Sequence, residues 1–271
     1  MKAGLYIVPT PIGNMDDITI RAINTLKGSD LILCEDTRVT KPLLQKYNII
    51  TKLSVYNDYS DNSVRLKILE QIKNGNVISL VSDAGTPLIA DPGYKLVDFL
   101  YSEGIYVDAL PGACSVISAL CLSGMPTDQF MFLGFMPRKF VAQEKLLKEI
   151  STSPATCIFF ESPKRVIDTL NVINKVLGAR ICAIVREISK IYQEVLKGTC
   201  LELIGRLENK EIKGEVVLLI QSAEVKISEH SILNGLKLLI SNGVSKSKSA
   251  EIIATLFNLS KNKIYILTKD M

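Results

Sequence analysis

The segment from Val81 to Gly93 carries the residue types best suited to holding a ligand. Two glycines and two prolines interrupt it, so it is neither a helix nor an interior strand. Gly85 lets the backbone approach a ligand closely, and Asp83 and Asp91 offer hydrogen-bond acceptors. A plain strand-to-helix connection needs only about two to six residues. Because open α/β sheets bind ligands in loops at the carboxyl ends of their strands, the segment predicts a binding site.

The first 110 residues alternate strand and helix patterns at the spacing of βα units. Strand patterns lie at 4–8, 30–34, 76–81 and 106–109, and amphipathic helix patterns lie at 19–27, 40–47, 62–74 and 94–102. These patterns predict a mostly parallel sheet covered by helices.

Each of these strands is followed by a loop rich in glycine, proline or polar residues. The four loops are residues 9–14, 35–38, 81–93 and 111–115. Because parallel strands end at the same edge of a sheet, residues far apart in the chain converge there. One such loop would mean little, but four together predict a cleft.

The second half of the chain predicts another α/β domain with a mixed sheet. Strand patterns at 130–135, 156–160, 181–185 and 216–221 alternate with helix patterns at 142–150, 164–177 and 200–209. Residues 191–196 predict a strand, and Lys197 and Gly198 predict a turn after it. We expect the boundary between the two domains within residues 114–125.

Beyond residue 224 the pattern changes to three short helices at 231–241, 246–257 and 262–269, with Ser245 and Ser260 as expected N-caps. Short helices that begin with basic residues resemble a helix-turn-helix unit. Packing on the body of the protein, or dimerisation, is an equally open alternative for this tail.

Composition restricts the chemistry. The 271 residues are 47% hydrophobic, enough for two modest α/β domains. The six cysteines form no C-x-x-C pair, and His230 is the single histidine, which argues against a metal site and against a histidine-dependent triad in the first 229 residues. We expect buried free thiols in a reducing compartment. The net charge of +4 permits a polyanionic partner without demanding one.

Nothing in the sequence predicts a membrane partner. No apolar run approaches the roughly 18 residues that a span requires. The first four residues lead directly into a strand pattern, without the features of a signal peptide. The sequence therefore predicts a cytoplasmic protein.

Five motifs occur in the order expected of one family: 6–14, 35–38, 81–93, 161–165 and 186–190. Together they make the chain similar to the type I methyltransferases of small-subunit ribosomal RNA, within the tetrapyrrole methylase superfamily. The resemblance extends from about Leu5 to the C-terminus and includes the helical tail.

The resemblance implies two α/β domains of the tetrapyrrole methylase type, residues 1–114 and 115–224, with the ligand cleft between them and a helix-turn-helix-like tail at 225–271. It implies an enzyme that uses S-adenosylmethionine, and no metal, to methylate the ribose 2′-hydroxyl of a cytidine in 16S rRNA. Naked small-subunit rRNA and the assembled small subunit are both open as the substrate. A homodimer is expected.

The chain departs from the family pattern in three places. Residues 56–60 stand where members often have a histidine, so a histidine base there fails for this protein. Ala113 and Cys114 replace a usual proline and serine, and Lys164 stands where histidine is common. These departures affect the roles expected of individual residues more than the resemblance to the family.

The resemblance also implies which residues contact the cofactor. They lie in the loops of both domains and are expected to offer mainly backbone groups: Pro11, Gly13, Asn14, Asp83, Ala84, Gly85, Thr86, Ile89, Ala90, Asp91, Ser115, Leu133, Gly134, and Gly214 with its neighbour Glu215.

A ribose hydroxyl is a poor nucleophile, so a positioned carboxylate should help it react. Carboxylates stand beside arginines in three places: Glu35 and Asp36 with Arg38, Glu161 with Arg165, and Glu187 with Arg186. Such a pair also serves as an internal ion pair, which we favour for Glu161 and Arg165, whereas we favour a functional role for Glu35 and Arg38. The base stays unassigned. Phosphate contacts are expected from the tail lysines and from Arg38, Arg138, Lys139, Lys164 and Arg165.

Two other functions remain open. A tetrapyrrole C-methyltransferase, acting on uroporphyrinogen or a precorrin, would share the donor cleft but has no need for residues 35–38 or the basic tail. A non-catalytic, ribosome-associated RNA-binding module would not need the full set of loops. A Rossmann dehydrogenase fails, because residues 9–14 stand where its G-x-G-x-x-G motif would be.

Overall fold

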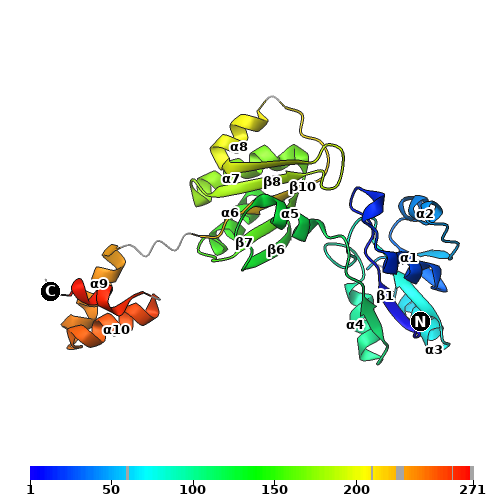
Figure 1. The fold of residues 1–271 in the computed structure, drawn as a ribbon, viewed down its shortest axis with the longest axis horizontal. Helices are drawn as coiled ribbons and strands as arrows, with labels where there is room; N and C mark the ends of the chain where they lie inside the picture. The colour runs from blue at the N-terminus through cyan, green and yellow to red at the C-terminus, as the bar shows by residue number, and fades with distance from the viewer. Residues whose placement is uncertain (59–60, 209, 224–228, 258, 269–271) are drawn as a thin grey trace. The chain divides into compact units, whose positions relative to one another are not determined.

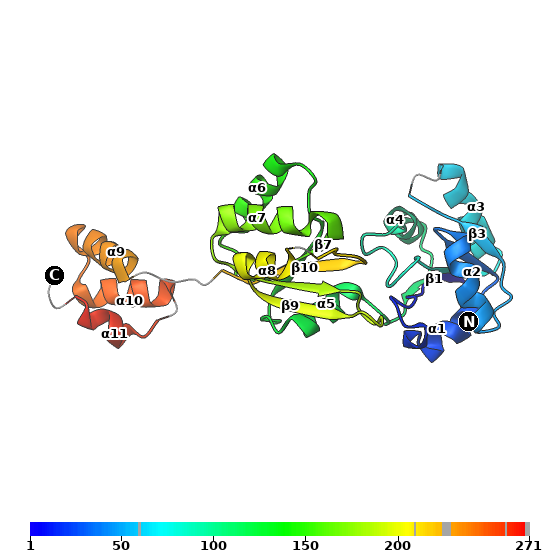
Figure 2. The ribbon, with the colours of Figure 1, turned by 90° about the horizontal axis from the view of Figure 1, so that it is seen from above.

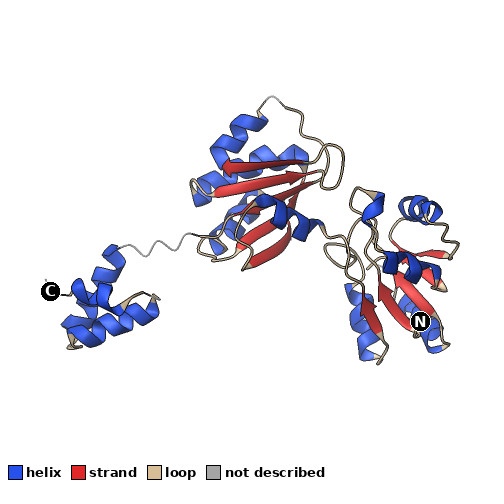
Figure 3. Cartoon of the chain, in the orientation of Figure 1, coloured by secondary structure: helices blue, strands red, loops and turns tan. Residues whose placement is uncertain are grey.

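The computed structural model describes residues 1–58, 61–208, 210–223, 229–257 and 259–268. The chain forms two compact units, Met1–Ser222 and Ala223–Met271. The first unit contains two five-stranded sheets, each with helices on both faces (Figures 1 and 3).

The first sheet is entirely parallel, as predicted, with the order β3-β2-β4-β1-β5. Its strands are β1 (Gly4–Ile7), β2 (Leu31–Cys34), β3 (Leu53–Val55), β4 (Val77–Leu80) and β5 (Val107–Ala109). Its helices are α1 (Ile20–Lys27), α2 (Thr37–Lys46), α3 (Asn62–Lys73) and α4 (Tyr94–Ser102). Buried side chains place α1 and α2 on one face and α3 and α4 on the other.

Two features of this sheet differ from the strand and helix patterns. The edge strand β3 was not among the four predicted strands; it is three residues long and only partly buried, so its pattern is weak. Helix α2 begins at Thr37 rather than residue 40, because the Asp36 side chain caps it by accepting a hydrogen bond from the Arg38 N–H at 2.8 Å.

The second sheet is mixed, as predicted, with the order β6-β7-β10-β8-β9 and β6 parallel to β7. Its strands are β6 (Phe130–Phe135), β7 (Thr156–Glu161), β8 (Ile181–Arg186), β9 (Glu194–Thr199) and β10 (Val216–Ile220). Helices α6 (Phe140–Glu149), α7 (Val166–Leu177) and α8 (Cys200–Leu207) cover one face, and α5 (Ser115–Ser123) covers the other (Figure 2).

The second half also corrects two predictions. The turn predicted at Lys197 and Gly198 is wrong: both residues pair with β8, opposite Ala183 and Cys182, so β9 continues through them. Helix α5 was not predicted; it occupies the segment where the domain boundary was expected and packs against the second sheet. Short 3-10 turns, η1 (Met15–Asp17) and η2 (Pro163–Arg165), complete this unit.

The second unit has its own small core, formed by α9 (Glu229–Ser241), α10 (Lys246–Leu256) and α11 (Lys261–Ile266). Ser245 caps α10 as predicted, accepting a hydrogen bond from the Lys248 N–H at 3.4 Å. Ser260 is the N-cap residue of α11 but makes no side-chain capping bond. The predicted helix ends at 209 and 269 lie outside the described residues.

All six cysteines are free thiols, four of them buried. The expectation of buried thiols is wrong for Cys121, which is exposed on α5, and Cys114 is only partly buried. No helix in the described part of the chain is long and apolar enough to cross a membrane.

Candidate active site

The loop that follows β4 is fixed to the loop that follows β1. Thr10 and Gly85 exchange two backbone hydrogen bonds of 2.9 and 3.0 Å, an isolated antiparallel bridge between loops. The Thr10 hydroxyl also donates to the Ser82 carbonyl at 3.0 Å, and the Ser82 hydroxyl donates to the Gly85 carbonyl at 3.0 Å. Residues more than 70 positions apart are therefore held rigidly at one sheet edge.

The same loop binds the two other loops of that edge. The Asp36 N–H, after β2, donates to the Asp83 carboxylate at 3.2 Å. The Thr86 hydroxyl donates to the Ala113 carbonyl, after β5, at 2.8 Å. The four loops that the parallel sheet was expected to bring together do meet, and the loop after β4 is their centre.

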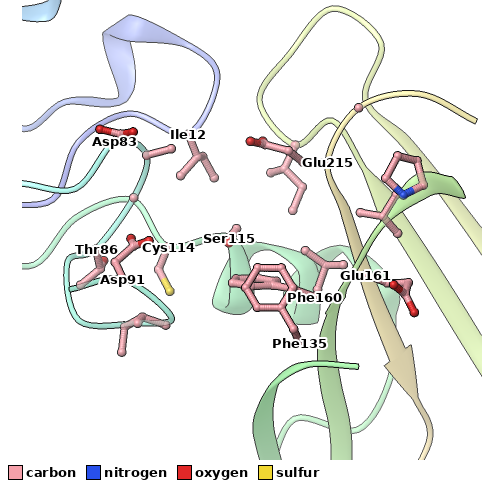
Figure 4. Close-up of a pocket in the computed structure, with 18 of the residues that line it drawn as sticks. Ile12, Asp83, Thr86, Asp91, Cys114, Ser115, Phe135, Phe160, Glu161 and Glu215 are labelled. Atoms are coloured by element: carbon pink, nitrogen blue, oxygen red, sulfur yellow. The ribbon is translucent and has the colours of Figure 1, made fainter. Parts of the chain in front are cut away.

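A cavity of about 420 Å³ lies against this centre, a volume within the range of small-molecule sites. Loops of the first sheet form one wall, and the ends of strands of the second sheet form the other (Figure 4). The lining residues are Ile12, Glu35, Asp83, Ala84, Gly85, Thr86, Ile89, Asp91, Cys114, Ser115, Phe135, Phe160, Glu161, Pro163, Ile188, Gly214, Glu215, Val216 and Val217.

The predicted cofactor residues divide into two groups. The cavity is lined by Asp83, Ala84, Gly85, Thr86, Ile89, Asp91, Ser115, Gly214 and Glu215. Not among its lining residues are Pro11, Gly13, Asn14, Ala90, Leu133 and Gly134.

Several residues of the second group have other contacts. Gly13 is packed against the turn after β8: a Cβ there would lie 2.6 Å from Lys190 Cγ and 2.8 Å from the Ile188 carbonyl oxygen. Asn14 caps η1, its side chain accepting from the Asp16 N–H at 3.1 Å. Leu133 packs against the core on the α6–α8 face of the second sheet.

The wall from the first sheet is acidic. Glu35, Asp83 and Asp91 all line the cavity. Burial, with the charges of Glu35 and Asp83 as weaker contributions, raises the pKa of Asp91 to about 6. Burial also raises the pKa of Glu35, and the charges of Asp83 and Asp36 add to this shift. The wall therefore favours a cationic ligand, which would relieve this repulsion.

Glu161 lines the cavity, but three donors of the protein bind its carboxylate. Its buried carboxylate accepts hydrogen bonds from the Thr169 hydroxyl at 2.5 Å, from the Ser162 N–H at 2.6 Å and from the Arg165 guanidinium. Arg165 also donates to the Met136 carbonyl at 3.0 Å. The pair thus ties β7 to the turn after β6, the internal ion pair that the sequence favoured.

Asp36 and Arg38 pair with each other beside the cavity rather than within it. The Arg38 side chain is 89% exposed and its Nη2 lies 2.6 Å from Asp36 Oδ2. The hydrogen bond from Arg38 lowers the pKa of Asp36. Asp36 thus acts as a helix cap with a charged partner, and Arg38 extends into solvent.

Glu187 supports the cavity wall from behind. Its carboxylate accepts from the Glu215 N–H at 3.0 Å and from Lys190 Nζ at 2.8 Å, and the bond from Lys190 is the main cause that lowers its pKa. Its backbone adopts a φ of 52°, which is uncommon for a residue with a side chain. Gly214 packs directly on it, since a Cβ at Gly214 would lie 2.3 Å from the Glu187 carboxyl carbon.

Sequence reasoning missed Cys114, in the loop after β5, and six residues of the opposite wall: Phe135, Phe160, Pro163, Ile188, Val216 and Val217. Most are apolar residues at the ends of strands or turns of the second sheet. The sequence indicates where the strands end, but only the pairing of the strands in the second sheet shows which ends face the cavity.

The predicted phosphate contacts lie outside the cavity lining. Arg138, Lys139 and Lys164 are exposed, in the turns that follow β6 and β7, whereas Arg165 is committed to Glu161. In the described residues, no group of histidine, cysteine, aspartate and glutamate side chains could hold a metal ion.

Known proteins resemble this chain at the level of both sequence and fold. Residues 4–204 match the family model of Tetrapyrrole (Corrin/Porphyrin) Methylases. Ribosomal RNA small subunit methyltransferase I of Rickettsia prowazekii is 46% identical over 98% of this chain and 96% of the relative. The Bacillus subtilis protein of the same name is 39% identical over 96% of this chain and 92% of the relative.

Two solved structures share the fold at low sequence identity. Diphthine synthase superposes with a TM-score of 0.61 at 14% identity, covering 80% of this chain and 89% of that one. The methyltransferase CobJ superposes with a TM-score of 0.60 at 16% identity, covering 82% of this chain and 95% of that one. Fold, motifs and family model agree, and this chain belongs to the tetrapyrrole (corrin/porphyrin) methylase family.

Proposed function

We propose that this protein transfers a methyl group from S-adenosylmethionine to the ribose 2′-hydroxyl of a cytidine in 16S rRNA. The observation that carries the proposal is a cavity between two sheets with an acidic wall on one side and an aromatic wall on the other. Near full-length similarity to relatives named ribosomal RNA small subunit methyltransferase I supports the choice of substrate.

The cavity suits S-adenosylmethionine in size and charge. The donor carries a sulfonium and an ammonium group, and Asp83 and Asp91 offer carboxylates whose mutual repulsion a cation would reduce. Backbone groups of Gly85, Thr86 and Gly214 would hold the remaining polar atoms, since these residues line the cavity. When bound, the donor supplies an activated methyl group, so alignment of the acceptor is the main task left to the protein.

Glu35 is our candidate for the group that orients or deprotonates the ribose hydroxyl. It lines the cavity, and partial burial, with the charges of Asp83 and Asp36, raises the pKa of its carboxyl. A carboxylate at this place is suited to accept a hydrogen bond or a proton from the ribose hydroxyl. Glu161 is buried and paired with Arg165, Asp36 is paired with Arg38, and Glu187 supports Glu215. We therefore assign these three to structural roles.

The RNA backbone would be held by exposed cations, Arg38 beside the acidic wall and Arg138, Lys139 and Lys164 beside the aromatic wall. The lysines of the second unit would add to this contact. We propose the assembled small subunit or its rRNA as the partner, a homodimer as the working form, and the cytoplasm as the site of action, where bacterial rRNA is found.

Calorimetric titration with S-adenosylmethionine, with NADH as a control, tests the donor. Micromolar binding of the first ligand alone is the expected result. Methylation of small subunits and of their naked rRNA, both from cells that lack this gene, tests the acceptor, with the modified nucleotide mapped by resistance of its 3′ phosphodiester to alkali. Methylation of uroporphyrinogen but of neither RNA substrate would contradict the proposal.

A further inference from the structure

Phe135, the last residue of β6, exposes 64% of its surface although it lines the cavity. It packs edge-to-face on Phe160, with ring centroids 5.4 Å apart and planes at 66°. Phe160 in turn packs edge-to-face on Phe132 at 4.9 Å. Figure 4 shows Phe135 and Phe160 beside each other at the cavity. Because this exposed ring also lines the cavity, its face and edge are available to a planar ligand.

The backbone is shaped to present this ring. The pairing of β6 with β7 shifts register between Phe132 and Phe135, and Gly134, with a φ of 71°, forms the bulge. Bulges of this kind re-aim a side chain. A regular strand would place the residue at 135 on the alternate face.

The turn that follows is clamped. The Met136 N–H donates to the Phe160 carbonyl at 3.0 Å, and the Met136 carbonyl accepts from Arg165 at 3.0 Å. Arg165 is itself held by buried Glu161. The backbone next to Phe135 is therefore held in place by three elements of the second sheet.

Charge divides the surroundings of the cavity into two sides. Glu35, Asp83 and Asp91 lie on the first wall, where a cationic donor fits. The side of Phe135 also has two carboxylates, but each is paired with a cation: Glu161 with Arg165 and Glu215 with Lys190. Arg138 and Lys139 follow Phe135 by three and four residues, and exposed Lys164 follows the lining residue Pro163. An anionic acceptor strand therefore fits the side on which Phe135 lies.

We propose that the base of the acceptor nucleotide, turned out of its RNA stack, stacks on the ring of Phe135. The inference rests on the proposed function and adds the residue that receives the nucleoside. A ribose inside a helix cannot reach a recessed cavity, so enzymes that modify nucleotides extrude them, and aromatic rings are their usual stacking partners. The donor's adenine is the other planar group, but ligands in such cavities are largely enclosed, whereas Phe135 stands at the rim.

The test compares Phe135→Ala, Phe135→Leu and Phe135→Tyr with the wild type. Phe140→Ala is the matched control: Phe140 is also an exposed phenylalanine, but it packs under Lys175 Nζ and does not line the cavity. Two quantities are measured for each protein: the Kd of S-adenosylmethionine by calorimetry, and kcat/KM for methylation of the RNA substrate.

We expect Phe135→Ala and Phe135→Leu to lose about 5- to 150-fold in kcat/KM for RNA, the range for one stacked base, with donor Kd within twofold of wild type. Phe135→Tyr, which keeps the ring, should retain activity, as should Phe140→Ala. A second arm uses RNA with an abasic ribose at the methylated position. On the abasic RNA, the kcat/KM of the wild type should fall by the factor that Phe135→Ala loses on intact RNA. The kcat/KM of Phe135→Ala should fall no further on the abasic RNA.

The outcomes separate the two proposals. A loss of donor affinity in step with activity would mean that the ring stacks on the donor's adenine, which overturns the inference. Unchanged RNA kinetics in Phe135→Ala, with an active wild type, would also overturn it and leave the proposed function intact. A wild type that binds the donor but methylates no RNA would overturn the proposed function and the inference together.

Discussion

Thr10 and Gly85, 75 residues apart, are joined by a reciprocal pair of backbone hydrogen bonds of 2.9 and 3.0 Å. The bridge links the loops that leave β1 and β4, and Gly85 adopts a φ of 89° to form it. Because Gly85 also lines the cavity, the conformation that closes the bridge also shapes the binding wall. The first prediction tests this coupling.

Gly85→Ala should lower stability and donor affinity together. The new Cβ would lie 3.1 Å from Ile12 Cγ2, at a φ that residues with side chains rarely adopt, so we expect a cost of about 1–3 kcal/mol. Urea denaturation and calorimetry measure the two effects. Gly75→Ala is the control, since Gly75 has a φ of 97° with nothing within 4 Å. It should lose stability but keep its donor affinity; equal donor affinity in both variants would contradict the coupling.

Asp91 should make the protein less stable as the pH rises. A carboxyl whose pKa is raised on folding to about 6 holds its proton more tightly in the folded state, so stability falls between about pH 4 and pH 6. Asp91→Asn should remove this fall and gain about 1–2 kcal/mol at pH 7, allowing for the solvent that reaches the group. Urea midpoints from pH 4 to pH 8 measure it. At pH 4 the wild type and Asp91→Asn should have nearly the same urea midpoint.

The same carboxyl predicts the pH dependence of donor binding. A cationic donor prefers charged Asp91, so affinity for S-adenosylmethionine should rise as the pH passes through about 6. Titrations at pH 5, 6, 7 and 8 would detect the change. In Asp91→Asn the affinity should be lower and nearly flat over this range, and an unaltered slope would assign the titration to another group.

Glu161→Gln should destabilise the protein by about 3 kcal/mol, because it removes the charge that balances the partly buried guanidinium of Arg165. Glu144→Gln is the matched control. It breaks the pair with Lys175, whose side chain is 64% exposed, and should cost less than about 1 kcal/mol. Equal denaturation midpoints for the two variants would show that the Glu161 pair is no stronger than a surface pair.

Glu35→Gln and Glu187→Gln should separate chemistry from support. Loss of a group that orients or deprotonates the hydroxyl lowers kcat by about 10²- to 10⁴-fold, which we expect for Glu35→Gln with little change in donor Kd. Glu187→Gln keeps an acceptor for the Glu215 N–H and loses only the charge facing Lys190, so kcat should fall less than tenfold. Single-turnover rates of the two variants give the comparison. A larger loss in Glu187→Gln than in Glu35→Gln would assign the chemical role to Glu187 and the supporting role to Glu35.

Most of the local elements, and the place where a ligand should bind, could be predicted from the order of the residues. Short apolar runs predicted most strands, and glycine, proline and aspartate predicted the loops after β1, β2, β4 and β5. These signals are local, and parallel pairing then requires the loops to share one edge. For that reason the acidic wall, including Asp83, Gly85 and Asp91, followed from the chain alone.

The other wall and the roles of the charged pairs could be read only from the folded chain. Phe135 and Phe160 reach the cavity through a bulge and a strand pairing that leave no periodic trace in the sequence. Glu161 and Glu35 look equivalent as carboxylates near arginines, and both line the cavity, yet Glu161 is buried and accepts hydrogen bonds from three donors, one of them Arg165, whereas Glu35 is exposed. Burial and hydrogen bonding set the chemistry of a carboxyl group. Both depend on which residues lie close to it in the folded protein, and its neighbours in the sequence do not determine this.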